Sequence, residues 1–160
     1  MLVKDRMSPA VTIEAGHDYK AALALMGEYG VQHLPVVTAD GELIGIVVER
    51  DLVMAGTRYL QCPVAVSELM QRDVLTVAPD NRTADAAMRM VNHRISGLPV
   101  VEGNRRVVGI ITDADILRAF IEAMPEESIF NARPAVKRRP PAMGVAEAQN
   151  EGTHSLAEPM

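Results

Sequence analysis

The chain contains one structural unit written twice. Residues 31–55, VQHLPVVTADGELIGIVVERDLVMA, align without a gap with residues 95–119, ISGLPVVEGNRRVVGIITDADILRA, at an offset of 64 positions. Upstream, residues 3–7 pair with residues 66–70 at an offset of 63. A repeat of this length requires a fold built from two copies of one supersecondary unit, each completing the core of the other.

Each copy predicts the same order of elements, β-α-β-β-α. The predicted elements are residues 11–13, 18–29, 34–37, 43–48 and 50–55 in the first copy, and 74–77, 83–93, 98–101, 107–112 and 114–123 in the second. The strands are β-branched apolar runs, and turn signals such as Asp40-Gly41 separate the last two strands of a copy. We therefore predict an α+β fold in which two β-α-β-β-α repeats pack with pseudo-two-fold symmetry.

Short polar residues mark the ends of the predicted helices. Asp18 and Thr83 stand where an N-cap would accept backbone amides, and Gly30 stands where a helix would stop. The boundaries we expect are a first repeat at 1–55, a linker at 56–65, a second repeat at 66–124 and a disordered tail at 125–160, where five prolines and little periodicity occur.

Composition excludes several classes of protein. The net charge is −5 and aromatic residues make up 3%, which argues against a nucleic-acid partner. Cys62 is the single cysteine, so neither an internal disulfide nor a multi-cysteine metal site is possible. No apolar run is long enough for a signal peptide or a membrane span, so we expect a cytoplasmic protein. No nucleophile-base pair, phosphate loop or clustered metal ligands stand out, so we expect neither an enzyme nor a required cofactor.

An aspartate follows the last buried strand of both copies, at Asp51 and Asp115. One interpretation is structural, because Thr112 and Asp115 have the spacing of a capping box. Asp51 is retained although Val48 replaces the threonine, which suggests a second role. A carboxylate at the end of a strand can accept both hydroxyls of a ribose, and the nearby helix amides and threonine would suit a phosphate. The sequence alone is compatible with both interpretations.

The motifs HLPVV and GLPVV, together with GIVVERD and GIITDAD, resemble those of a tandem pair of CBS (cystathionine-β-synthase) domains, a Bateman module. The resemblance covers residues 1–123. It implies regulatory binding of an adenosine-containing ligand, AMP, ADP, ATP or S-adenosylmethionine, in two clefts between the repeats. It also implies a homodimer, and with no output domain in view the signal would reach a still unknown protein partner in trans.

The same resemblance assigns site residues by position. One predicted site comprises Val11, Val31, Gln32, His33, Ile110, Thr112, Ala114 and Asp115. The other comprises Val47, Val48, Arg50, Asp51, Leu75, Ile95, Ser96 and Gly97. We expect the site with Thr112 to be the stronger one, because Val48 lacks a hydroxyl. Arg50 offers the second site a phosphate contact, and Arg94 either does the same or covers a helix end.

Two alternative functions remain. One is a dimeric interaction scaffold that binds no nucleotide, suggested by Val48. The other is a regulator that touches nucleic acid through the basic cluster 137–139 of the tail, although a solvated tail is the simpler interpretation.

Overall fold

The computed structural model describes residues 1–58 and 63–124, and it confirms an α+β fold of two β-α-β-β-α repeats. The elements are η1 (Val3–Asp5), β1 (Ile13–Glu14), α1 (Tyr19–Tyr29), β2 (His33–Val37), β3 (Leu43–Val48), α2 (Glu49–Arg58), α3 (Val66–Leu69), α4 (Thr83–His93), β4 (Gly97–Glu102), β5 (Arg106–Thr112) and α5 (Asp113–Ala123). Residues 59–62 of the predicted linker, which include Cys62, lie outside the described residues. The predicted tail at 125–160, with its basic cluster, lies outside them as well.

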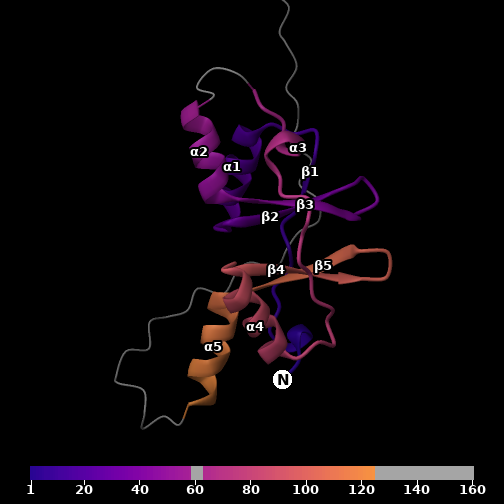
Figure 1. The fold of residues 1–160 in the computed structure, drawn as a ribbon, viewed down its shortest axis with the longest axis vertical. Coiled ribbons are helices and arrows are strands. Elements are labelled where there is room, and N and C mark those ends of the chain that lie inside the picture. The colour runs from indigo at the N-terminus through magenta and orange to yellow at the C-terminus, as the bar shows by residue number, and fades with distance from the viewer. Residues whose placement is uncertain (59–62, 125–160) are drawn as a thin grey trace, which may run out of the picture.

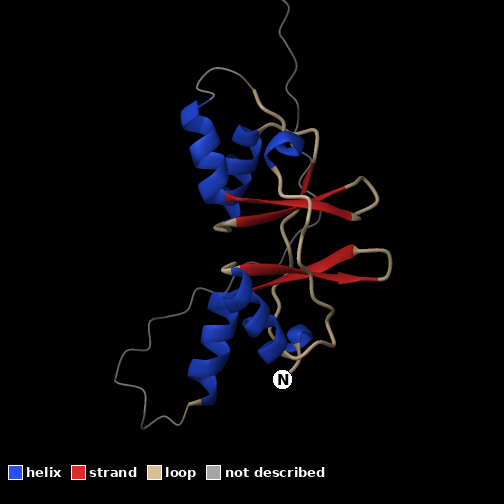
Figure 2. Ribbon diagram, in the orientation of Figure 1, coloured by secondary structure: helices blue, strands red, loops and turns tan. Residues whose placement is uncertain are grey.

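The two sheets face each other across the middle of the molecule, and the helices lie on their outer sides (Figure 2). In the first repeat β1 pairs parallel to β2, and β2 pairs antiparallel to β3. In the second repeat β4 pairs antiparallel to β5. The strand predicted at 74–77 is reduced to one bridge, between Val77 and Val100, in the register that joins Ile13 to Val36 in the first repeat.

The helix ends agree with the sequence in part. The Asp18 side chain accepts the amide of the third helical residue of α1 at 2.8 Å, and Gly30 ends that helix in the left-handed conformation, as predicted. The prediction that Thr83 caps α4 is wrong. Arg82 occupies the cap position and Thr83 is the first helical residue. Its hydroxyl donates to the carbonyl of Met1 at 3.0 Å, because the N-terminal segment packs at this point.

The segment that precedes each repeat in sequence packs onto the other repeat. Val3 is completely buried in the core of the second repeat, and its amide donates to the carbonyl of Asn81 at 2.9 Å. Val66 is completely buried in the core of the first repeat, and its amide donates to His17 at 2.7 Å. Figure 1 shows the N-terminus beside α4, in the half that the later residues build.

Both crossing segments then join the edge of the sheet they reach. Ser8 exchanges two backbone hydrogen bonds with Ile110 of β5, at 2.8 and 2.9 Å. Gln71 does the same with Ile46 of β3, at 2.9 and 3.0 Å. Each packed half is therefore completed by a segment that belongs, by sequence, to the other repeat. As a result, residues of both repeats lie along the boundary between the halves.

Two equivalent glycines permit this crossing. A Cβ added at Gly45 would lie 2.4 Å from the sulfur of Met70 and 3.1 Å from the backbone oxygen of Gln71. A Cβ at Gly109 would lie 2.9 Å from the sulfur of Met7 and 3.0 Å from the backbone oxygen of Ser8. The absence of a side chain at these positions lets the crossing segments approach the strands closely.

None of the helices in the described part of the chain has both the length and the apolar character needed to cross a bilayer.

Candidate ligand-binding clefts

Among the clefts that the described residues form between the repeats, two are related by the same pseudo-symmetry as the fold. The larger cleft has a volume of about 1000 Å³ and the smaller cleft about 510 Å³. Gln32 and His33, at the start of β2, line both of them. These volumes lie in the range of sites that take a ligand of nucleoside size or larger.

Each cleft combines the approach to a Leu-Pro strand of one repeat with the start of the closing helix of the other. The larger cleft contains the predicted residues Val31, Gln32, His33, Thr112, Ala114 and Asp115. The smaller cleft contains the predicted residues Val48, Arg50, Leu75, Ile95, Ser96 and Gly97. The structure thus brings together, across the repeats, most of each set that the sequence assigned by resemblance.

Four predicted residues do not line the clefts. Val47 is buried in the first core, because it alternates with Val48 along β3 and faces the opposite side of the strand. Ile110 is buried where Ser8 pairs with it. Val11 packs against the first core. None of these three residues is among those that line the two clefts.

Asp51 is the fourth of these residues. Its side chain is 36% exposed, and its carboxylate lies 3.6 Å from Arg50 Nε. Since Val48 has no side-chain oxygen, the start of α2 lacks the cap that holds Asp115 in the second repeat, and Asp51 is not drawn inward to the cleft.

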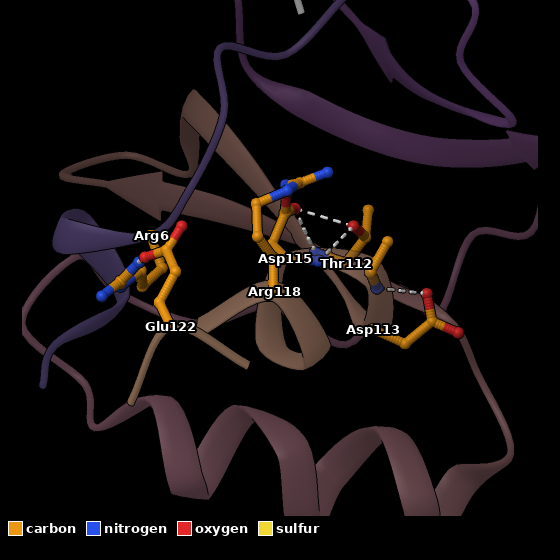
Figure 3. A network of polar contacts seen from close by, with 7 residues as sticks. Arg6, Thr112, Asp113, Asp115, Arg118 and Glu122 are labelled. Atoms are coloured by element: carbon orange, nitrogen blue, oxygen red, sulfur yellow. Dashed lines mark hydrogen bonds and ion pairs between the residues drawn. The ribbon is translucent and has the colours of Figure 1, made fainter. Parts of the chain in front are cut away.

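Asp115 forms the capping box that the sequence left as one of two interpretations. Its Oδ2 accepts from the backbone amide of Thr112 at 2.9 Å and from the Thr112 hydroxyl at 2.7 Å, while its amide donates to that hydroxyl at 3.3 Å. Its Oδ1 pairs with Arg118 Nη1 at 3.1 Å (Figure 3). A carboxylate offers about four acceptor positions. Three are used here, so a ribose diol would have to displace Arg118.

The first amides of α5 are also used within the chain. Asp113 donates its amide to the carbonyl of Ser96 at 3.0 Å, and the amide of Ala114 donates to Asp113 Oδ1 at 2.7 Å. The amide of Asp115 is satisfied by Thr112. These amides and the Thr112 hydroxyl therefore already have acceptors within the chain, and a phosphate at this helix start would have to displace them.

Several charged side chains of the clefts were not assigned from the sequence. The larger cleft also contains Glu49, Asp113, Arg118 and Glu122, and the smaller cleft contains Glu49 and Asp73. Arg118 was detectable in principle, because residues three apart share a helix face and it follows Asp115 at that spacing. Arg94 ends α4 in the left-handed conformation and also lines the smaller cleft. Its contact with a phosphate stays a prediction.

No group of three or more His, Cys, Asp or Glu side chains is arranged to hold a metal ion within residues 1–58 and 63–124.

Comparison with known proteins agrees with the repeat. The sequence model of the CBS domain matches residues 3–57 and again residues 66–122. Among curated proteins, the L-aspartate semialdehyde sulfurtransferase of Methanocaldococcus jannaschii is 37% identical over 120 residues, which cover 74% of this chain and 23% of that enzyme. The chain thus spans about a quarter of the length of this relative.

Solved structures of similar fold include ligand complexes. A CBS domain pair crystallised with 5′-methylthioadenosine and S-adenosyl-L-methionine has a TM-score of 0.71 and 35% identity, covering 76% of this chain and 97% of that one. The protein CBSX2 in complex with AMP has a TM-score of 0.69 and 28% identity, covering 76% of this chain and 96% of that one.

Proposed function

This chain belongs to the CBS domain family as a tandem pair, and we propose that it is a regulatory module that binds an adenosine-containing ligand between its repeats. The observation that carries the proposal is the construction of the clefts. In each one, residues before a Leu-Pro strand of one repeat face the first turn of a helix from the other. Similar domain pairs hold 5′-methylthioadenosine, S-adenosyl-L-methionine or AMP.

A ligand in such a cleft would act by favouring one arrangement of the repeats. Both clefts contain residues of both repeats, so a bound molecule contacts two bodies at once. A ligand shifts a conformational equilibrium only through its unequal affinity for the two states. We propose that the favoured state is passed to a protein partner in trans, in the cytoplasm, with no required cofactor and no catalytic step in this chain.

The roles of the lining residues follow from their surroundings. Ile95, Leu75 and Val48 supply an apolar wall to the smaller cleft, and Val31 does so for the larger one. His33 brings a polar ring to the lining of both clefts, and Ser96 brings a hydroxyl to the smaller one. Asp115 serves first as a cap, so its replacement would disturb α5 as well as any ribose contact.

Thermal unfolding with and without ligand tests the proposal. AMP, ADP, ATP, S-adenosylmethionine, 5′-methylthioadenosine and NAD are each added in excess. A ligand present at 100 times its Kd stabilises the folded state by about 2.7 kcal/mol, which raises the Tm by several degrees for a domain of this size. Ala114→Trp, which places a large ring in the larger cleft, is the matched variant and should reduce the response. A flat response to all six ligands would contradict the proposal.

An exposed apolar face supports the homodimer that the family resemblance implies. The side chains concerned are Met88 and Val91 of α4 and Leu117, Phe120 and Ile121 of α5, all of them more than half exposed. The two helices contact each other on the outer side of the second sheet (Figure 1). A grouped apolar face of this kind usually marks an interaction surface. A second copy of the chain is the occupant we propose.

Sedimentation analysis tests the dimer. The chain should sediment as a dimer, and Phe120→Glu should shift it toward the monomer, whereas Glu28→Gln on α1 should leave the mass unchanged. A monomeric wild-type chain at micromolar concentration would contradict the dimer and would leave the face to another protein.

A further inference from the structure

The larger cleft is acidic. Four carboxylates line it, from Glu49, Asp113, Asp115 and Glu122, against one guanidinium, from Arg118. They come from both repeats, since Glu49 begins α2 and the other three belong to α5. Any ligand in this cleft therefore lies in a field of negative sign.

Part of this charge is balanced inside the protein. Arg118 pairs with Asp115, and Arg6 pairs with Glu122 (Figure 3). Glu49 and Asp113 take part in none of the ion pairs formed by the described side chains. Asp113 accepts one amide of its own helix. The carboxylates of Glu49 and Asp113 are therefore not balanced by an ion pair, whereas Arg118 and Arg6 each already pair with another carboxylate.

The donors that would hold a phosphate in this cleft are engaged as well. The amides of Asp113, Ala114 and Asp115 donate to acceptors within the chain, and the hydroxyl of Thr112 donates to Asp115. A phosphate at this helix start would meet carboxylates in place of open amides. A phosphate monoester carries −1.5 to −2 charges near pH 7, so its repulsion here is substantial.

The smaller cleft has a different balance. Arg50 and Arg94 line it against Glu49 and Asp73, so the lining charges cancel and two guanidinium groups are present. Val48 occupies the position that is equivalent to Thr112. It has no hydroxyl, so Asp51 has no counterpart of the hydrogen bond that Thr112 donates to Asp115. Arg50 pairs with Asp51 at 3.6 Å, whereas Arg94 takes part in none of the ion pairs formed by the described side chains. Arg94 therefore offers an anion in this cleft a cationic partner of the kind that the larger cleft lacks.

We propose that the larger cleft selects adenosine ligands without phosphate, with a neutral thioether or a cationic sulfonium at the 5′ position, and rejects AMP, ADP and ATP. Glu49 and Asp113 are the residues that set this selectivity. Nucleotides with phosphate are left to the smaller cleft. The inference rests on the proposed function, because it assigns a ligand class to a site that function requires.

Calorimetric titration tests the inference with three probes, 5′-methylthioadenosine, S-adenosylmethionine and AMP. The larger cleft is isolated by Val53→Trp, an exposed position that lines only the smaller cleft. Met54→Trp is a second filling variant from the same face, in case the first fails to fold. In this background we expect both phosphate-free ligands to bind, and AMP to bind at least about tenfold more weakly at low salt.

Neutralising the two carboxylates supplies the decisive comparison. Asp113→Asn with Glu49→Gln keeps the size of both side chains, and an Asn oxygen can still accept the amide of Ala114. The ratio of the AMP Kd to the 5′-methylthioadenosine Kd should fall at least about threefold. The control, Glu68→Gln with Glu102→Gln, removes two exposed charges that line neither cleft and should leave the ratio unchanged.

The outcomes separate the two proposals. Charge selection is wrong if AMP and 5′-methylthioadenosine bind the Val53→Trp chain with equal Kd. It is also wrong if the variant with both carboxylates neutralised keeps the wild-type ratio of the two Kd values. In either case the proposed binding function stands. If the wild-type chain binds none of the three probes, the proposed function fails and the inference fails with it.

Discussion

The ring Nε2 of His33 lies 2.9 Å from the hydroxyl of Ser96, and this hydrogen bond joins the two repeats. His33 begins β2, and Ser96 directly precedes β4. His33 lines both clefts, and Ser96 lines the smaller one. The bond therefore links the approaches to the two Leu-Pro strands, beside the clefts that both repeats line.

His33→Ala and Ser96→Ala should show energetic coupling across the repeats. A solvent-accessible hydrogen bond of this kind contributes about 0.5–1 kcal/mol, and the double variant should lose less than the sum of the single ones. Urea unfolding of the four proteins measures the coupling. His33→Ala should also weaken ligands in both clefts, because its ring borders both. Strict additivity of the stabilities would show that the bond does not hold the repeats together.

Thr112→Val should destabilise the protein by about 1–2 kcal/mol, because it removes the cap of α5 and leaves the buried Asp115 without its hydroxyl donor. It makes the second repeat resemble the first, where Val48 holds this position. The reverse change, Val48→Thr, gives α2 a cap and should be neutral or stabilising. Denaturant midpoints of both variants check the pair. An equal loss from both would mean that the threonine matters for something other than capping.

The order of elements was predictable from sequence because it is encoded locally and twice. Each apolar run, each turn and the ends of α1 at Asp18 and Gly30 depend on near neighbours in the chain. The repeat also implied equivalent registers, and the pairs Ile13 with Val36 and Val77 with Val100 are such equivalents. The weaker strand at 74–77 differs because its pairing depends on packing that the repeat does not determine.

The exchange of the two short segments was not predictable in this way. Residues near Val3 and Val66 have no periodicity of their own, and their partners lie far away in sequence. The cap at Thr83 was misassigned for the same reason, because Met1 reaches its hydroxyl only through the exchange.

The candidate site was predictable only in its outline. Resemblance located the segments around His33 and Thr112, but it did not show that Val47 and Ile110 face the core. The charges of Glu49 and Glu122 were missed because single acidic residues on a helix carry no pattern, and only the fold brings them to one cleft.

Gly45→Ala and Gly109→Ala should each destabilise the protein by about 1–3 kcal/mol, the usual range for overpacking. The added methyl group would press on Met70 or Met7 and on the backbone of the crossing segment. Gly16→Ala is the control, because a Cβ there meets nothing within 4 Å. Thermal unfolding compares the Tm of the three variants with that of the wild type. A Gly109→Ala protein as stable as the wild type would show that the crossing segment sits farther from β5 than described.

Val3→Ala and Val66→Ala test the exchanged segments directly. Both side chains are completely buried, one in each core, so each truncation should cost about 1–3 kcal/mol through lost apolar contact and a residual cavity. Val53→Ala, at a position that is 51% exposed and outside the apolar face of α4 and α5, is the matched control and should change stability by less than about 0.5 kcal/mol. Val66 anchors the first core and Val3 the second. Hydrogen exchange should therefore show the loss in β2 and β3 for Val66→Ala and in β4 and β5 for Val3→Ala. Protection lost in the opposite halves would mean that each segment packs with its own repeat.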